Sequence, residues 1–435
     1  MVYDKGNLLY ILNEWFEEIL PQYIEREFPY EHVDSDLISV LAGVRRGGKT
    51  YLLYQIADRL RKSIPAENII YVNLEDDRLY PLTGNEIGDI LTVYRQNFKA
   101  SESHKIYLLL DEVQNIPDWE RTLRRLHDRE RNLKIIITGS NAHLLSSEIA
   151  SSLRGRTLTH IVYPFSFGEI LKARNIPFET GKIRLSRKKN VILRQMNEYI
   201  EQGGFPQVVF EKTKVELLRE YYRSIMYRDI IERHSIRNIA LFENFLKLTV
   251  QNMSARFSFG KTADVLRSIG YKVSKNTLIE YLKFIENAFL AFETPVFSYT
   301  VKDQLQHPRK IYLIDTGLRN AVSFRFTDDT GRLAENIVFV ELMRRQGSEI
   351  YHWKDQQGNE VDFVIRKDFH VSQLIQVCWI LKDDKIFKRE VNALIKAMKE
   401  FKLTSGLILT EDMYEDRKID GFSIQFRPLW LWLLE

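Results

Sequence analysis

The stretch Gly43-Val-Arg-Arg-Gly-Gly-Lys-Thr50 decides the fold of the first part of the chain. It matches the pattern G-x-x-x-x-G-K-[ST] and lies between an apolar segment, Leu37 to Leu41, and a helical pattern beginning near Lys49. Glycines in such a loop let backbone amides surround phosphates, and the helix start adds the positive end of its dipole. The sequence therefore predicts a phosphate-binding loop.

Each residue of this loop has an expected role in holding a nucleoside triphosphate. Lys49 would neutralise the β and γ phosphates, and Thr50 would ligate Mg²⁺. The other expected nucleotide contacts come from the rest of the loop and the residue after it: Gly43, Val44, Arg45, Arg46, Gly47, Gly48 and Tyr51.

Two adjacent acids follow a second apolar strand, Ile106 to Leu110. Carboxylates at the carboxyl end of a buried strand are suited to work at the edge of a parallel sheet. Asp111 is expected to hold Mg²⁺ through water, and Glu112 to polarise the water that attacks the γ phosphate. An Asp-Glu pair is also a common transition from strand to loop, so the prediction depends on its coupling to the phosphate loop.

Further polar residues follow these elements. Ser140, or as second choice Asn141, would sense the γ phosphate after the strand Lys134 to Thr138; the alternative is a loop or helix cap. Arg154 or Arg156 would reach the γ phosphate of a neighbouring subunit, where a guanidinium stabilises developing charge. The alternative for these arginines is an ordinary surface position.

Apolar strand patterns alternate with helical patterns up to about residue 138, which predicts a parallel sheet with helices on both faces. An amphipathic helix, Asn7 to Phe28, precedes them. The expected strands are Leu37 to Leu41, Ile69 to Leu74, Ile106 to Leu110 and Lys134 to Thr138, and the expected helices are Tyr51 to Leu60 and Trp119 to His127.

The middle of the chain is mostly helical and fits a winged helix. Helices Phe259 to Ile269 and Ser274 to Phe289 are joined by a turn, and Thr294 to Tyr299 and Lys310 to Ile314 would be wing strands. Lys272, Lys275 and Lys283 would lie near a DNA phosphate backbone. Winged helices also serve as protein contacts, so both kinds of partner stay open.

Several motifs together resemble the AAA+ family of prokaryotic ATPases that carry a C-terminal domain of unknown function. They are the phosphate loop, L-L-L-D-E-V-Q-N-I-P-D-W-E at Leu108 to Glu120, I-T-G-S-N at Ile137 to Asn141, L-R-G-R at Leu153 to Arg156 and G-G-F-P at Gly203 to Pro206. The similarity covers nearly the whole chain. It implies binding of ATP and ADP rather than guanine nucleotides, and a homo-oligomer in the form of a ring or opened ring.

The C-terminal part resembles the PD-(D/E)xK nuclease core attached to these ATPases. The resemblance implies a helix acid, Glu335, and a turn acid, Asp362, while the third acid and the lysine of the family are replaced by Gln376 and Cys378. An amide and a thiol supply neither the charge nor the base, which favours a degenerate fold that binds DNA or partners. Lys382 or Lys385 could replace the missing lysine, which keeps an active nuclease open.

The composition limits the number of domains and the kinds of site that the chain can contain. The chain has 435 residues, a net charge of +4 and 44% hydrophobic residues, which suits about three soluble domains and leaves nucleic acid binding undecided. No apolar run is long enough for a membrane span, and we expect a cytoplasmic protein. The single cysteine, Cys378, cannot form an internal disulfide, and the nine histidines show no zinc-site spacing.

The sequence thus predicts an α/β AAA+ ATPase with a helical lid, a winged helix and an α/β restriction-endonuclease-like domain. The expected boundaries are 1–36 for the helical segment, 37–165 for the ATPase core, 166–240 for the lid, 241–315 for the winged helix and 316–435 for the nuclease-like domain. The expected function is magnesium-dependent ATP hydrolysis coupled to remodelling of DNA or a DNA complex. The alternatives are an ATP-dependent switch on a protein partner and a structure-specific endonuclease.

Overall fold

The computed structural model describes residues 4–141, 153, 155–179, 189–323, 329–380 and 384–435. They form two compact units. The first holds the residues up to Tyr163 with the short segment Asn287–Phe289, and the second holds Pro164–Glu286 and Leu290–Glu435. No helix among the described residues is both long and apolar enough to cross a membrane.

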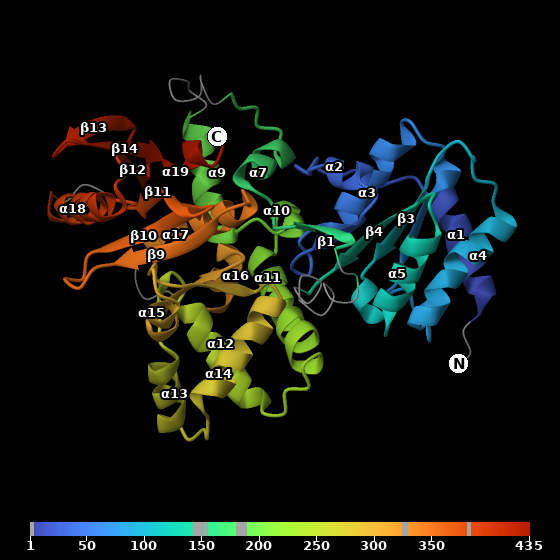
Figure 1. Ribbon diagram of the computed structural model, residues 1–435, viewed down its shortest axis with the longest axis horizontal. Helices are drawn as coiled ribbons and strands as arrows, with labels where there is room; N and C mark the ends of the chain where they lie inside the picture. The colour runs from blue at the N-terminus through green and yellow to red at the C-terminus, as the bar shows by residue number, and fades with distance from the viewer. Residues whose placement is uncertain (1–3, 142–152, 154, 180–188, 324–328, 381–383) are drawn as a thin grey trace. The chain divides into compact units, whose positions relative to one another are not determined.

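The first unit is built on a parallel five-stranded sheet of order β2-β3-β4-β1-β5, with helices flanking it (Figure 1). The strands are β1 Ile38–Ala42, β2 Ile69–Asn73, β3 Ile106–Asp111, β4 Leu133–Gly139 and β5 Thr157–Ile161. The helices are α1 Lys5–Glu17, α2 Glu31–Asp34, α3 Lys49–Arg61, α4 Ile87–Asn97 and α5 Trp119–Arg129. The predicted parallel sheet is confirmed, and its four predicted strands lie within one residue of their expected positions.

The strands of this sheet are nearly continuous apolar runs because both faces are covered. Ile135, Ile136 and Ile137 are at most 1% exposed although successive side chains point to opposite faces. Trp15 of α1 joins the core on one side and donates its indole N–H to the Ile69 carbonyl at 2.6 Å. The N-terminal helix is therefore part of this unit.

The predicted helix from Asn7 to Phe28 was too long. Helix α1 ends at Glu17, and residues 18–29 have no regular secondary structure. Pro21 disfavours a helical conformation at Leu20, since the proline ring clashes with the preceding residue. The segment after α1 is irregular instead, and it places Arg26 at a buried position of the first unit.

The second unit starts with helices, as predicted. They are α7 Phe167–Ala173, α9 Lys189–Gln202, α10 Pro206–Phe210 and α11 Lys214–Ser224, continued by the π-helix η6 Ile225–Glu232. The turn after α9 depends on Gly203, which has φ +72°, and a Cβ there would lie 2.0 Å from Asp315 Oδ1. Asp315 in turn accepts hydrogen bonds from the amides of Gly204 at 2.7 Å and Leu318 at 3.1 Å. The G-G-F-P motif therefore ties α9 to the start of a later helix, α16 Thr316–Val322.

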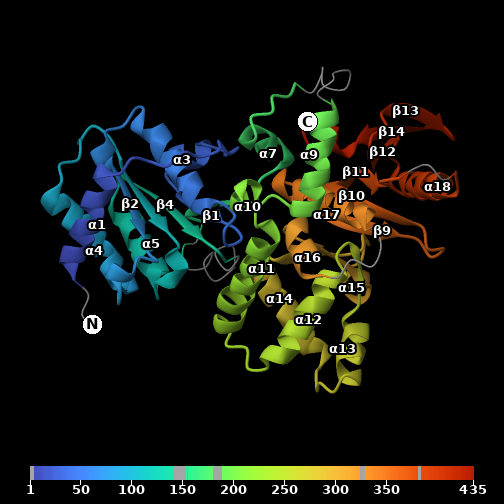
Figure 2. The same cartoon turned by 180° about the vertical axis from the view of Figure 1, so that it is seen from behind.

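The middle of the chain holds helices beside a small antiparallel sheet of order β6-β8-β7. In order, the elements are α12 Ile239–Gln251, β6 Ala255–Phe257, α13 Phe259–Ser268, α14 Lys275–Asn287, β7 Ala291–Thr294, α15 Val301–Gln306 and β8 Arg309–Leu313. Figure 2 shows α12, α13 and α14 grouped together. The two predicted helices are present. The predicted strand Thr294 to Tyr299 was wrong, because Pro295 has no N–H for a sheet and β7 ends just before it.

The C-terminal part contains a six-stranded mixed sheet of order β13-β14-β12-β11-β10-β9. Its strands are β9 Glu349–Lys354, β10 Glu360–Lys367, β11 His370–Val377, β12 Ser405–Thr410, β13 Glu415–Ile419 and β14 Phe422–Pro428, with helices α17 Thr330–Arg344, α18 Asp384–Phe401 and α19 Leu429–Trp432. The predicted separate α/β unit is confirmed. The sequence did not predict β13, since this edge strand is charged and mostly exposed and so has no apolar alternation.

A pH test follows from Glu286 in α14. Burial, and then repulsion from Glu293, raise the pKa of Glu286 to about 7, so folding disfavours its charged form. Stability should fall as the pH rises from about 4.5 to about 7, because the folded state holds this proton longer than the unfolded chain. A Gln side chain keeps the acceptor for the Glu293 amide. We expect Glu286→Gln to match the native protein at low pH and to gain up to about 3 kcal/mol at pH 8.

The measurement is the difference in melting temperature between the variant and the native protein across this pH range. The difference in melting temperature between the two proteins removes the contribution of the other titrating groups, because both proteins contain them. A difference that does not change with pH would contradict the assignment.

Candidate active site

The carboxyl ends of three parallel strands, β1, β3 and β4, bring the predicted site residues to one edge of the first sheet. Leu41 of β1 is paired with Thr138 of β4, and Asn73 of β2 is paired with Asp111 of β3. Strand β4 lies between β1 and β3. The phosphate loop after β1, the acids after β3 and the polar end of β4 are therefore neighbours at this edge, as expected for parallel strands.

The phosphate loop is shaped by close backbone contacts. A Cβ on Gly43 would lie 2.2 Å from the Val162 carbonyl oxygen, so only glycine fits where β1 passes the end of β5. Gly48 has φ +100° and precedes α3, whose first residue is Lys49. The Lys49 ammonium donates to the carbonyls of Gly43 at 3.3 Å and Val44 at 3.2 Å, and the side chain is 3% exposed. The loop thus encloses a buried cation.

Arg26 also contacts this loop, although no motif or pattern in the sequence singles it out. Its guanidinium donates to the Gly47 carbonyl at 3.1 Å and the Tyr163 carbonyl at 2.6 Å. The Arg26 backbone amide donates to the side chain of Gln55 in α3 at 2.7 Å. One buried arginine therefore links the phosphate loop, the end of the first unit and α3.

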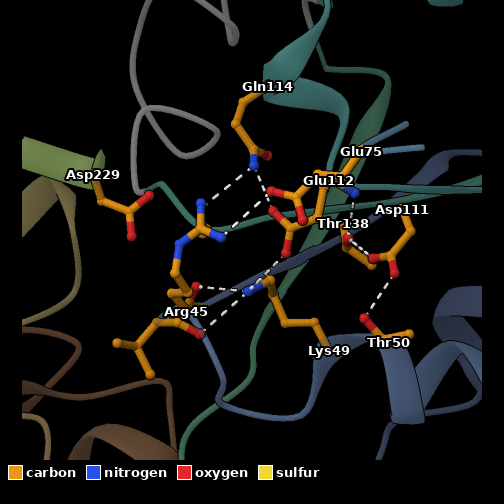
Figure 3. Close-up of polar contacts among 12 residues, drawn as sticks. Arg45, Lys49, Thr50, Glu75, Asp111, Glu112, Gln114, Thr138 and Asp229 are labelled. Carbon is orange, nitrogen blue, oxygen red and sulfur yellow. Dashed lines mark hydrogen bonds and ion pairs between the residues drawn. The ribbon is translucent and has the colours of Figure 1, made fainter. Parts of the chain in front are cut away.

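Asp111 is held by hydroxyl groups on both of its oxygens. Thr50 donates to Oδ2 at 2.7 Å, Tyr71 donates to the same oxygen at 3.1 Å, and Thr138 donates to Oδ1 (Figure 3). Burial, and then the charge of Glu112, raise the pKa of Asp111. The predicted Mg²⁺ ligands Thr50 and Asp111 are thus brought together, and they offer hard oxygen atoms of the kind Mg²⁺ prefers.

Glu112 faces Lys49 across the site. Its Oε1 lies 3.4 Å from the Lys49 ammonium, and its Oε2 accepts a hydrogen bond from Gln114. Burial opposes ionisation of Glu112, yet Lys49 and Gln114 hold its pKa below the ordinary value. The backbone at Glu112 is left-handed, with φ +57°, and its amide donates to Thr138 Oγ1 at 2.9 Å. The two acids therefore have opposite pKa shifts.

The end of β4 contributes more than the sequence indicated. Ser140 and Asn141, the predicted sensors, are both buried. Gln114 lies 3.4 Å from the Ser140 hydroxyl. The residue in direct contact with Asp111 and Glu112 is Thr138, which the sequence analysis treated as the end of a strand. Its signal was available, since a hydroxyl residue at the predicted carboxyl end of a parallel strand lies at the same edge of the sheet as the acids.

The remaining loop residues differ in exposure. Val44 is fully buried, whereas Arg46 is exposed with φ +65° and Tyr51 is 49% exposed on α3. Arg45 lies 3.4 Å from Glu75, just after β2. Arg46 and Tyr51 are thus exposed, whereas the Arg45 side chain is only 14% exposed and points toward Glu112 and Gln114 (Figure 3).

Of the two arginines predicted to act on a neighbouring subunit, Arg154 lies outside the described residues. Arg156 is described, and it forms an ion pair with Asp128 at the end of α5, with an Nε to Oδ1 distance of 2.7 Å. Its role toward another subunit stays a prediction.

Comparisons with known proteins agree with this geometry. Residues 35–171 match the model of an AAA domain, and residues 193–329 and 330–426 match two domains of unknown function, DUF8612 and DUF4143. An uncharacterized protein of Methanocaldococcus jannaschii is 35% identical over 439 residues, which cover 96% of this chain and 95% of that protein. The chain is a member of the AAA+ family.

Other relatives of this AAA+ protein share its full length. An uncharacterized protein of Haemophilus influenzae is 31% identical over 402 residues, covering 92% of this chain and 95% of that protein. Among solved structures, the chain is similar to a Walker-type ATPase of Pyrococcus abyssi, with 16% identity and a TM-score of 0.45 over 74% of this chain and 95% of that one. It is also similar to the Orc1 protein of Aeropyrum pernix in complex with DNA, with 13% identity and a TM-score of 0.31 over 74% and 92% of the two chains.

The nuclease-like residues of this AAA+ protein are only partly brought together. Glu335 of α17 and Asp362 of β10 share one cation, Lys310 of β8. Gln376 contacts the Asp362 amide instead, and Cys378 is buried, with its pKa raised to about 12 chiefly by burial. Lys385 is exposed, and Lys382 lies outside the described residues. The lysine that reaches the acids is thus one that the sequence analysis placed in a wing strand.

The contacts of Arg26 generate a test of the phosphate loop. A lysine at this position keeps the charge but has no planar fork to serve two separate carbonyls. We expect Arg26→Lys to destabilise the first unit by about 1–3 kcal/mol and to weaken nucleotide affinity, because a buried carbonyl loses its donor. Thermal melting and titration with a fluorescent adenine nucleotide would measure both effects.

The control for this test is Glu25→Ala, which changes an exposed neighbour. Equal stability and affinity in Arg26→Lys and the native protein would show that the guanidinium does not support the loop.

Proposed function

We propose that this AAA+ protein binds ATP with Mg²⁺ at the edge of the first sheet and hydrolyses it. The observation that carries the proposal is the convergence of four groups from two separate segments, the start of α3 and the end of β3. Lys49 lies 3.4 Å from Glu112, and Thr50 lies 2.7 Å from Asp111. A cation for the phosphates, a hydroxyl and a carboxylate for Mg²⁺ and a second carboxylate to orient water are the parts that phosphoryl transfer to water uses.

Each group has a definite task in this proposal. The loop amides and Lys49 would hold the β and γ phosphates, and Lys49 would exchange its contact with Glu112 for one with the γ phosphate. Released from Lys49, Glu112 would orient a water molecule and accept its proton as the water attacks. Thr50 and Asp111 would hold Mg²⁺, which supplies charge neutralisation at the phosphates when bound.

The role of Glu112 is tested by Glu112→Gln. The amide keeps the size of the side chain but cannot accept the proton, so we expect ATP affinity within about threefold of native and a turnover lowered by about 10²-fold or more. Lys49→Ala should instead weaken ATP binding itself. Steady-state ATPase rates and nucleotide titrations separate the two effects.

The matched control is Glu102→Gln, at an exposed position. Native turnover in Glu112→Gln would exclude Glu112 as the residue that activates water.

We further propose that hydrolysis is coupled to DNA or a DNA-bound complex through the helices α13 and α14. Ser274 precedes α14 and accepts a hydrogen bond from the Thr277 amide at 3.1 Å. Lys272 and Lys275 are exposed around this helix start, and Lys283 is exposed further along the same helix. Lysines and a helix start are common contacts to phosphate backbones, which supports DNA as the partner.

A protein partner is the second candidate, favoured by a different observation. Val265 and Ile269 of the α13 region are 47% and 60% exposed. Apolar side chains on a surface are typical of protein contacts when they lie close together. In this alternative the protein is an ATP-dependent switch.

The two candidates are separated by ATPase rates with and without duplex, branched and single-stranded DNA. If DNA is the partner, DNA should stimulate turnover, and Lys272→Glu with Lys275→Glu should weaken DNA binding and lower its salt dependence. Lys367→Glu, at an exposed position of β10, is the charge control. Turnover that no DNA changes would favour the protein switch.

A homo-oligomer is also part of the proposal, because the AAA+ resemblance implies arginines that act between subunits. Arg156 would have to leave Asp128 to reach a neighbouring γ phosphate. Mass measurement with and without ATP, together with the dependence of turnover on protein concentration, tests this assembly.

A further inference from the structure

Lys310 occupies the centre of the acidic cluster in the nuclease-like domain. Its ammonium lies 3.0 Å from Glu335 Oε1, 2.8 Å from Glu360 Oε1 and 2.8 Å from Asp362 Oδ1. The side chain is 3% exposed. An ammonium has three protons, and each of these carboxylates can accept one. The donor capacity of Lys310 is therefore used entirely within the protein.

The acids are also satisfied by further protein donors. Tyr312 donates its hydroxyl to Glu335 Oε1 at 2.7 Å, and the amide of Val377 donates to Asp362 Oδ2 at 2.9 Å. Three carboxylates around one ammonium leave an excess of negative charge. Burial, and then repulsion from Asp362, raise the pKa of Glu335.

Gln376 stands at the position of the third nuclease acid, and it makes hydrogen bonds within the protein instead. Gln376 accepts from the Asp362 amide at 3.1 Å and donates to Glu390 of α18. These contacts position Gln376 between β10 and α18. The acids that a nuclease of this fold would use for Mg²⁺ therefore do not fit the ion, since Lys310 lies between them and protein donors contact Glu335 Oε1 and both oxygens of Asp362. Among the described residues, no group of three or more acid, histidine or cysteine side chains is arranged to hold a metal.

We propose that the ammonium of Lys310 takes the place of a divalent cation in this domain, so that the nuclease-like fold binds no Mg²⁺ at Glu335 and Asp362. Burial opposes a charge on Lys310, yet the carboxylates hold its pKa well above the ordinary value, and it stays a cation. A catalytic lysine of a nuclease must face water and a scissile phosphate, whereas this one is enclosed.

The cluster also joins two sheets. Lys310 belongs to β8 in the middle sheet, whereas Glu360 and Asp362 belong to β10 in the C-terminal sheet. The backbone of Phe297 donates to the His352 carbonyl at 2.6 Å, which links the same two parts. The ion cluster thus fastens the segment after the α13 and α14 helices to the nuclease-like domain, and the two should move as one body.

The test uses Mn²⁺ as the probe on the full chain without nucleotide. Binding is followed by electron paramagnetic resonance, and stability by thermal melting. The native protein and Asp362→Asn should bind the same amount of Mn²⁺, since the acids offer no native site. Lys310→Ala removes the ammonium from the middle of the three acids, so this variant should bind about one more equivalent of Mn²⁺ than the native protein. The double variant Lys310→Ala/Asp362→Asn should not bind this additional equivalent.

Stability gives a second readout. Removing Lys310 leaves buried acids without a counter-charge, so Lys310→Ala should lower the melting temperature by more than about 5 °C. Mn²⁺ should restore part of this loss in Lys310→Ala and leave the native melting temperature unchanged. The control Lys367→Ala, on the exposed end of β10, should behave as the native protein does.

If Lys310→Ala does not fold, the comparison of the native protein with Asp362→Asn and Glu335→Gln still decides the question. Equal Mn²⁺ binding in these three proteins supports the proposal. A native Mn²⁺ equivalent that either variant loses would overturn it. So would Mg²⁺-dependent DNA cleavage by the native protein that is absent in Asp362→Asn, since that would make Lys310 part of a working nuclease.

Discussion

The shared direction of β1, β3 and β4 is the constraint on which the candidate active site depends. Because these strands are parallel, Gly43, Asp111 and Thr138 all reach the same edge of the sheet. Strand β5 closes the other side of β1, and the Val162 carbonyl after it leaves no room for a side chain at Gly43. The phosphate loop is thus held in place by sheet pairing before any ligand is considered.

The charges at this edge balance one another within the first unit. Lys49 is buried among carbonyls and faces Glu112, while Asp111 is surrounded by hydroxyl donors. Buried charges need partners of this kind, since an isolated charge would shift its pKa and become neutral. The same principle is at work in the second unit, where Lys310 lies among the carboxylates of Glu335, Glu360 and Asp362. In our proposal a ligand replaces Glu112 as the partner of Lys49 in the first unit, whereas Lys310 in the second unit is enclosed by protein groups.

The sequence alone predicted those parts of the molecule whose functional residues lie in one contiguous motif or at the end of an apolar strand. Gly43 to Thr50 is a contiguous motif, and Asp111 and Glu112 end an apolar run, so the sheet and its acids could be inferred before the structure. Arg26 and Lys310 could not, because their partners lie far away in the chain: Arg26 reaches Tyr163, and Lys310 reaches Asp362. A single basic residue in an otherwise apolar pattern does not indicate which distant residue it will contact. Helix α1 was overextended because apolar spacing continued past Glu17, and the effect of Pro21 outweighed it.

The turn at Gly203 and Gly204 has a mechanical consequence for the second unit. Asp315 accepts hydrogen bonds at the same time from the amide of Gly204, two residues after α9, and from the amide of Leu318 in the first turn of α16. The Asp315 carboxylate therefore bridges the two helices. If α9 rotates or slides, either α16 moves with it or the buried hydrogen bonds to this carboxylate break, and each such bond is worth about 1.5–3 kcal/mol. Displacements that start at α9 are therefore transmitted to the C-terminal half of the unit rather than absorbed at the turn.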